Sequence, residues 1–291
     1  MDTSTLKPAE VALYFLKQGV AKHRDRYESV FLKAVLAGVM LSFGGLLSEV
    51  ISGGSPALTL SNPGIVKILG GFVFPVGLVM IVLQGLELLT SNMMVFPMAV
   101  LKGAIPWWSL PLNWLIVFFG NLTGSLFFAA VLVHYSGIIS VEPYETYVKT
   151  FALHKASDPQ WHQIFLRGIG CNWLVCIAVW QAAGARDTIS KIYAIWLPIW
   201  LFVACSFDHV VANMFSVPLG IMFGADLTVA EYIRKSLIAS LLGNIIGALF
   251  VGLPATYFYL WDYDAGGLRG AEAGEVERRE QSSDNTEEKI R

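Results

Sequence analysis

Six long apolar segments run through this 291-residue chain and set the main constraint on its fold. They cover approximately residues 30–52, 66–104, 110–137, 163–183, 191–224 and 232–260. About 20 apolar helical residues cross the hydrocarbon core of a bilayer, so each segment is long enough to span it. Only 14% of the residues are charged, against roughly 25% in soluble domains. The sequence therefore predicts an all-α polytopic membrane protein.

The second and fifth segments are too long for one straight helix, and polar residues interrupt each near its middle. A pattern of acid, asparagine, methionine and proline recurs across the two interruptions, as Glu87-x4-Asn92-Met93-x3-Pro97 and Asp208-x4-Asn213-Met214-x3-Pro218. The third and sixth segments repeat as well, through Gly120-Asn121-Leu122-Thr123-Gly124 and Gly243-Asn244-Ile245-Ile246-Gly247. Three spans per half make the second half enter the membrane upside down. We expect an inverted 3+3 repeat with two discontinuous helices.

The repeat divides the chain into three parts. A transmembrane domain covers 29–261, with repeat 1 at about 29–137 and repeat 2 at about 161–261. Residues 1–28 predict a cytoplasmic amphipathic helix, lying on the inner membrane surface or packed against the protein. Residues 262–291 form an acidic tail that we expect to be disordered. Lys and Arg are more frequent in the segments on the side of the N-terminus, which places both termini in the cytoplasm, and we expect a multi-pass protein of the plasma membrane.

Three ionisable residues lie well inside the spans, where such groups are costly and usually functional. Glu87 and Asp208 occupy equivalent positions of the repeat, and we expect each to accept hydrogen bonds from the free amides of its helix break. His209 lies at the second break, opposite Thr90 of the first. Glu49, near the end of the first span, is interpreted as interfacial.

The second half-helices are expected to begin near Ser91 and Val210. Their amide ends then point toward the middle of the membrane and favour an anion there. Asn92, Asn213 and Asn244 are further candidates for supporting the breaks. The glycines of the two GNxxG sequences are interpreted as helix-packing positions.

Other classes of protein fit poorly. A net charge of −2 leaves no basic excess to bind nucleic acid. An enzyme would need clustered histidines and acids or an activated nucleophile, and no such cluster is evident, so we expect neither catalysis nor a metal or cofactor. The three cysteines, Cys171, Cys176 and Cys205, are interpreted as small apolar fillers.

The chain resembles the formate-nitrite transporter family over roughly residues 5–260. The most specific motif is Ser206-Phe207-Asp208-His209-Val210-Val211-Ala212-Asn213-Met214-Phe215, which is similar to the family's signature of an aromatic, an acid and His followed by Ala-Asn-Met. Supporting motifs lie in the first break and in the third, fourth and sixth spans, at Leu88–Asn92, Asn113-Trp114, Asn172–Cys176 and Gly243–Gly247. Within the family the chain looks closest to the fungal nitrite-transporting branch.

The resemblance implies an aquaporin-like protomer with six transmembrane helices, assembled as a homopentamer, with one pore in each protomer. His209 would be the central pore histidine and Thr90 its hydrogen-bond partner. The family's other pore positions match three further groups of residues. Phe202 would form the outer constriction, and Phe74, Leu78 and Leu89 would form the inner one. Lys155 would be the lysine of the outer vestibule, with Asn172 as its polar neighbour. Leu89 stands where phenylalanine is common, and Asp208 where glutamate is usual.

These observations predict transport of nitrite, a small weak-acid anion, together with a proton. Lys155 and the helix dipoles would draw in the anion, and protonation at or near His209 would neutralise it for passage between the apolar constrictions. Formate has the same shape and charge and remains an alternative substrate. A second alternative is an aquaporin-like channel for neutral solutes, although Asn-Met replaces the Asn-Pro-Ala motif of that class.

Overall fold

The structure is a computed structural model, which describes residues 5–261, 263–264 and 277–278. The regular secondary structure of the described residues is helical apart from two two-residue strands, β1 (Tyr263–Asp264) and β2 (Glu277–Arg278), which pair antiparallel. The rest of the predicted tail, 262–291, lies outside the described residues. The helical elements, in chain order, are α1 (Pro8–Arg24), α2 (Tyr27–Gly53), α3 (Pro56–Ser61), α4 (Pro63–Val73), α5 (Val76–Leu83), α6 (Leu89–Leu101), α7 (Ser109–Phe127), η1 (Phe128–Tyr135), α8 (Tyr144–Ala156), α9 (Trp161–Gly184), α10 (Thr188–Ala204), α11 (Val210–Met222), α12 (Val229–Glu231), η2 (Tyr232–Leu237) and α13 (Ile238–Leu260).

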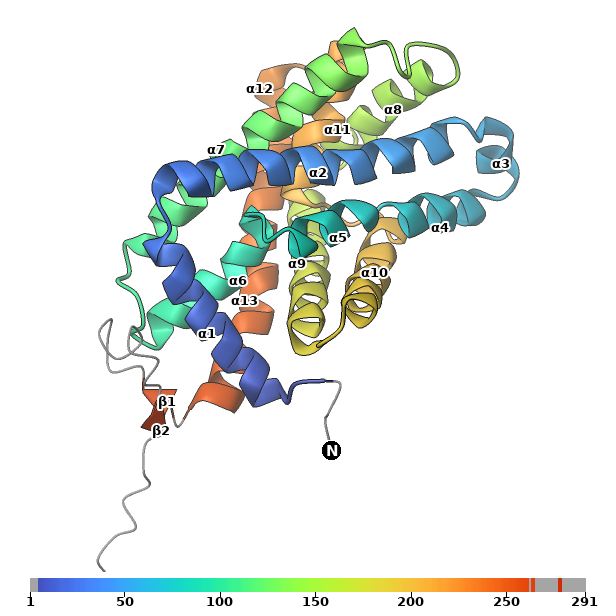
Figure 1. The fold of residues 1–291 in the computed structure, drawn as a ribbon. Coiled ribbons are helices and arrows are strands. Elements are labelled where there is room, and N and C mark those ends of the chain that lie inside the picture. The colour runs from blue at the N-terminus through green and yellow to red at the C-terminus, as the bar shows by residue number, and fades with distance from the viewer. Residues whose placement is uncertain (1–4, 262, 265–276, 279–291) are drawn as a thin grey trace, which may run out of the picture.

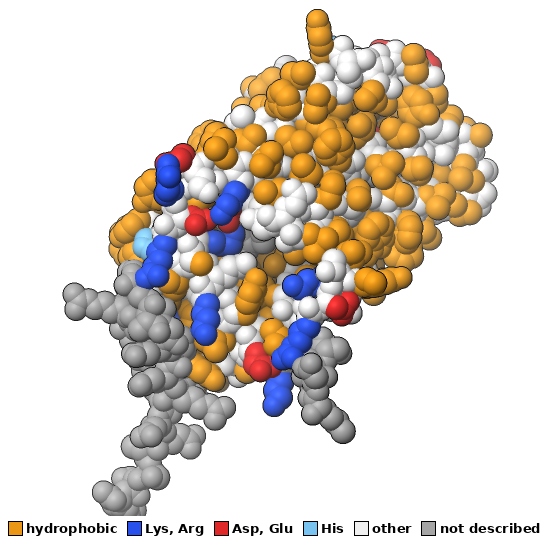
Figure 2. Space-filling view, in the orientation of Figure 1, with side chains coloured by type: hydrophobic (Ala, Val, Ile, Leu, Met, Phe, Trp, Pro, Cys, Tyr) orange, Lys and Arg blue, Asp and Glu red, His pale blue; other side chains and the backbone are white. Residues whose placement is uncertain are grey.

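All six predicted spans are helical, and both predicted breaks are present. Among the described residues, five helical stretches are long and apolar enough to cross a membrane, namely 27–53, 63–83, 109–135, 161–184 and 229–260. The two half-helices α6 and α11 have 13 residues each and are too short to cross alone. Large apolar side chains cover most of the visible surface, whereas Lys and Arg gather at the end formed by α1 (Figure 2). An apolar belt with a basic end is typical of a membrane protein.

Glycines allow two repeat-related helix pairs to pack very closely. A Cβ added at Gly124 of α7 would lie 1.9 Å from the Val35 carbonyl oxygen of α2. In the second half, a Cβ at Gly247 of α13 would lie 2.3 Å from the Ile169 carbonyl oxygen of α9. Only a residue without a side chain permits such approaches. The predicted packing role of the GNxxG glycines is therefore confirmed.

Helix α1 packs on the protein itself, which decides between the two interpretations of residues 1–28. Its apolar side chains Val11, Phe15 and Leu16 are fully buried, and the Phe15 ring stacks on Trp180 of α9. The preceding backbone is also anchored, since the Leu6 N–H donates to the Gly184 carbonyl oxygen at 2.8 Å. Figure 1 shows α1 crossing the same end of the bundle as α6 and α13.

Helix α8 is an element that the hydropathy pattern did not predict. It lies between the two halves, outside the six apolar segments, and only Val148, Ala152 and Ala156 of its 13 residues are buried. It packs against α11 and α2 at the end of the bundle opposite α1 (Figure 1). Because its buried stripe is narrow and its sequence polar, this helix is stabilised by tertiary contact rather than by a hydrophobic run.

Candidate functional site

The two helix breaks have the same backbone geometry. The chain between α5 and α6 turns at Gly85 with φ +65°, and the chain between α10 and α11 turns at Ser206 with φ +62°. These residues are separated by 121 positions, the offset of the repeat. A left-handed serine costs about 1 kcal/mol or more relative to glycine, so the surrounding contacts must hold it there.

Two asparagines from the neighbouring spans satisfy the backbone of the breaks. The Asn121 side chain of α7 accepts from the Leu89 N–H at 3.0 Å and donates to the carbonyl oxygens of Glu87 and Ala34 at 2.9 and 2.8 Å. Asn244 of α13 does the same for the second break. It accepts from the Val210 N–H at 2.9 Å and donates to the carbonyl oxygens of Asp208 and Gly168 at 2.9 and 2.8 Å. Helix α6 therefore begins at Leu89, two residues before the predicted start.

The acid at each break is paired with a lysine and an asparagine instead of with backbone amides. Glu87 forms an ion pair with Lys22 of α1 and accepts from the Asn92 amide at 2.7 Å. Asp208 forms an ion pair with Lys155 of α8 at 2.9 Å and accepts from the Asn213 amide at 3.5 Å. The prediction that these acids accept from the free amides is wrong, because Asn121 and Asn244 already occupy the amides of Leu89 and Val210.

His209 and Thr90 meet where the two breaks approach each other. The His209 Nδ1 accepts from the Ala212 N–H at 3.1 Å and caps the first turn of α11. The proton of a neutral ring is then on Nε2, which lies 3.0 Å from the Thr90 hydroxyl oxygen and donates to it. Both ring nitrogens are thus engaged, and the side chain is 3% exposed.

Asn172 of α9 braces this meeting point. Its amide donates to the carbonyl oxygens of Thr90 at 3.1 Å and Asn244 at 2.8 Å, and the residue is fully buried. It therefore lies between the two breaks and links them, and it does not line the cavity beside Lys155. The expectation that it neighbours Lys155 in the vestibule is wrong.

Two phenylalanines cover one side of His209. The Phe202 ring stacks on the imidazole with centroids 5.9 Å apart, and the Phe74 ring meets the edge of Phe202 at 5.8 Å. Phe74 therefore belongs with Phe202, and its assignment to the inner constriction is wrong. Leu78 and Leu89 are buried at 2% and 1% exposure, and their role as the inner constriction remains a prediction.

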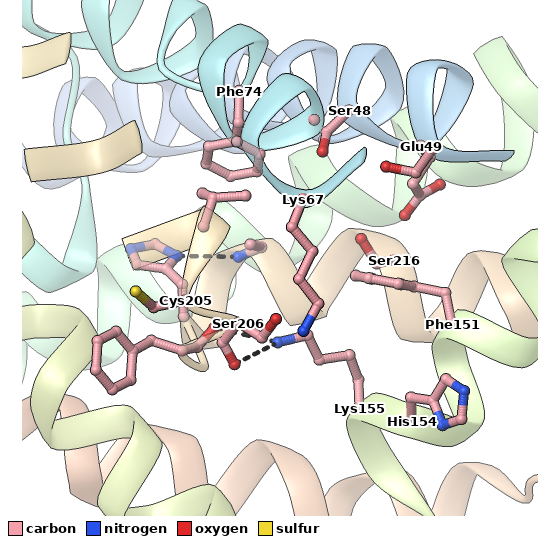
Figure 3. A pocket seen from close by; sticks show the side chains of 18 of the residues that line it. Ser48, Glu49, Lys67, Phe74, Phe151, His154, Lys155, Cys205, Ser206 and Ser216 are labelled. Carbon is pink, nitrogen blue, oxygen red and sulfur yellow. Dashed lines mark hydrogen bonds between the residues drawn. The ribbon is translucent and has the colours of Figure 1, made fainter. Parts of the chain in front are cut away.

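A cavity of about 830 Å³ opens beyond the phenylalanines, between α2, α4, α8 and α11. Figure 3 shows Lys67 and Lys155 pointing into it below Phe74. The Lys155 ammonium, however, is held by Asp208 and by the Phe207 carbonyl oxygen at 3.1 Å. Within the described part of the chain, the cavity-lining cations without an ion-pair partner are Lys67 and Arg167. The expected vestibule is present, but its unpaired positive charge lies on other residues than Lys155.

Two other expectations concern single residues. Cys205 is exposed and lines the cavity, so it is not an apolar filler, whereas Cys171 and Cys176 are buried. Glu49 is only 4% exposed and lines the same cavity, so its side chain is enclosed by the protein; its depth at the membrane interface remains a prediction.

Sequence reasoning missed Asn121 and Lys22 as parts of the site. The repeat offset could have identified Asn121, because Asn244 was already a candidate and the two asparagines occupy equivalent positions. Nothing in the local sequence marks Lys22, since its partner Glu87 lies 65 residues away.

Two buried helix breaks from an inverted repeat, joined by a histidine and opening on a positively charged vestibule, define a membrane transport protein with a central pore. Residues 9–257 match the profile of the formate/nitrite transporter family. The chain is 39% identical over 274 residues to a probable formate transporter of Methanothermobacter thermautotrophicus, covering 89% of this chain and 99% of the relative. The chain therefore belongs to the formate/nitrite transporter family.

Solved structures agree with this assignment. A pentameric formate channel with formate bound superimposes with a TM-score of 0.70 at 32% identity, over 80% of this chain and 98% of the channel. A second structure, an ion channel of the same family, gives a TM-score of 0.77 at 27% identity, over 85% and 98% of the two chains. The relatives are transporters and channels, and the chain is a multi-pass membrane transporter rather than an enzyme.

Proposed function

We propose that each protomer conducts formate and nitrite as weak acids, taking up one proton with each anion. The observation that carries this proposal is the contact between His209 and Thr90, buried behind the stacked rings of Phe202 and Phe74. A charged anion crosses such an apolar constriction at high cost, whereas the neutral acid crosses it cheaply.

The unpaired Lys67 and Arg167 and the amide ends of α6 and α11 raise the local concentration of anions. The proton then neutralises the anion before it passes Phe202. His209 donates a hydrogen bond through Nε2 at the narrowest point. The passing solute takes the place of Thr90 as the acceptor of that hydrogen bond. Leu78 and Leu89 form the second constriction on the inner side.

Formate is supported by the relatives, which include a probable formate transporter and a formate channel with formate bound. Nitrite is isosteric with formate and rests on the resemblance described above. The pentameric state of the solved formate channel supports a homopentamer for this chain. The basic end at α1 supports cytoplasmic termini and, with them, a place in the plasma membrane (Figure 2).

Uptake of labelled formate into proteoliposomes tests the proposal, with nitrite, lactate and chloride as competitors and with an imposed proton gradient. We expect uptake to rise with an inward proton gradient and to be inhibited by nitrite and not by chloride. Inhibition by chloride, or uptake that ignores the gradient, would refute weak-acid transport.

The variant His209→Asn is the sharper test of the histidine, because asparagine keeps a side-chain oxygen for the Ala212 N–H and so preserves the helix cap. We expect it to assemble and to lose selectivity or rate. His162→Ala, at an exposed position of α9, is the matched control and should transport like the wild type.

A further inference from the structure

Glu49 is a buried acid without a partner. It lies on the last turns of α2, is 4% exposed, and neither carboxyl oxygen has a hydrogen-bond partner within the described residues. Two other acids nearby are paired: Asp158, which also lines the cavity, with His154 at 2.5 Å, and Asp208 of the second break with Lys155 at 2.9 Å. The side chain of Glu49 lines the same cavity as Asp158, His154 and Lys155.

Close packing of α2 on α11 holds Glu49 opposite Ser216. A Cβ added at Gly45, one turn before Glu49, would lie 2.8 Å from the Phe215 ring, so only glycine permits this approach. In Figure 3 the Glu49 carboxyl group and the Ser216 hydroxyl face each other across the cavity wall. The packing of α2 on α11 therefore fixes the position of the Glu49 side chain at the cavity.

A buried carboxylate without a partner is costly, so Glu49 needs a proton or a cation. The charges around it decide between these. The ionisable side chains that face the cavity come from the elements packed around it: Tyr147, His154 and Lys155 of α8, Asp158 just after α8, Lys67 of α4, Arg167 of α9, Cys205 at the end of α10, and His209 at the α10–α11 break. Pairing leaves Lys67 and Arg167 unopposed, and this positive excess repels an inorganic cation. A proton is the ligand that fits.

The pore histidine is not free to give up a proton, because both of its ring nitrogens are engaged. The Nδ1 of His209 accepts from a backbone N–H and its Nε2 bonds to Thr90. Helix α11 leads from His209 past Ala212 to Ser216, and all three residues line the cavity. At 1.5 Å per residue, Ser216 lies about 10 Å along the helix from His209, on the route by which an anion approaches.

We infer that Glu49 is the proton-loading residue of the outer vestibule, which gives its carboxyl proton to the incoming formate or nitrite anion. The O–H bond of Glu49 breaks, an O–H bond forms on the anion, and the neutral acid enters the pore. Hydronium from the outer solution then reprotonates the carboxylate, so no electrons are exchanged and one proton moves with each anion. This inference rests on the proposed function, because it supplies the proton that weak-acid transport requires.

The test compares Glu49→Gln with Glu49→Asp in proteoliposomes, from about pH 5 to about pH 7.5. Glutamine keeps the size of the side chain and removes the exchangeable acid. We expect Glu49→Gln to slow formate uptake about tenfold or more at the higher pH, where a positioned proton donor matters, and by less than about twofold at the lower pH, where bulk protons suffice. Glu49→Asp should restore most of the rate. Glu142→Gln, an exposed acid before α8, is the control for loss of charge and should leave the profile unchanged.

The outcomes separate this inference from the proposed function. If the wild type shows proton-linked uptake and Glu49→Gln has the same rate at every pH, the inference is wrong and the proposed function stands. If the wild type shows no proton linkage, the proposed function fails first. Should Glu49→Gln fail to assemble, infrared difference spectra of the wild type and Glu49→Asp decide. Formate should convert a protonated-carboxyl band to a carboxylate band, and the band should shift in Glu49→Asp; spectra without such a band overturn the inference.

Discussion

The two bracing asparagines provide the most quantitative prediction. Replacing Asn121 by leucine keeps the volume of the side chain but removes its three hydrogen bonds. The Ala34 carbonyl oxygen lies inside α2 and keeps its helical partner, whereas the Leu89 N–H and the Glu87 carbonyl lose theirs. Each buried backbone group without a partner costs about 1–3 kcal/mol, so Asn121→Leu should cost about 2–6 kcal/mol.

That cost is a large share of the 5–15 kcal/mol that stabilises a typical fold. At roughly 2–4 °C per kcal/mol, the melting temperature should fall by about 4 °C or more. Asn244→Leu should cost a similar amount, because it removes the equivalent three bonds from Val210, Asp208 and Gly168. Thermal unfolding of the detergent-solubilised protein measures both, and size-exclusion chromatography reports assembly.

Thr123→Val is the matched control for this experiment. It is also a polar-to-apolar change of similar volume on α7, but Thr123 is exposed and its hydroxyl donates to the Phe119 carbonyl oxygen one turn earlier. We expect its free energy of unfolding to lie within about 0.5 kcal/mol of the wild-type value, as is usual for surface substitutions. If Asn121→Leu has the same melting temperature as Thr123→Val, the asparagines do not brace the helix breaks.

Two further predictions concern charged groups. Breaking the buried Lys155–Asp208 pair with Lys155→Met or Asp208→Asn alone should cost about 3–5 kcal/mol of folding stability, because each change leaves one buried charge unpaired. The double variant should recover most of that stability, since no buried charge remains unpaired. Thermal unfolding of the wild type and the three variants completes the double-mutant cycle, and additive costs would show that the pair is not coupled. Burial of His23 against Trp108, with repulsion from Arg24, lowers the pKa of this imidazole, so the docked α1 is most stable above the ordinary value of about 6.5 and loses stability as the pH falls through the lowered pKa. Protease cleavage of the N-terminal segment should accelerate on acidification in the wild type and less so in His23→Gln, and equal acceleration in both would contradict this role for His23.

The sequence by itself determined the class, the spans and the family. Hydropathy is a local property, so the six apolar segments and the two polar interruptions could be read directly from the chain. The repeat also predicted that Glu87 and Asp208 would have equivalent environments, and their matching Lys and Asn partners agree with that equivalence. The Thr90–His209 contact was predicted from the family resemblance, and the two side chains lie within hydrogen-bond distance.

Only the tertiary structure decided which buried polar groups satisfy one another. Lys22 reaches Glu87 because α1 docks on the bundle, and Asn121 reaches the first break because Gly124 brings α7 against α2. Helix packing also brings the Phe74 ring against Phe202 and points the Glu49 side chain toward Ser216. Partners that lie tens of residues apart are chosen by the distances between crossing helices, and no local pattern in the chain encodes those distances. The sequence alone therefore determines that a pore of this family forms, and the packing decides which residues carry its charges and protons.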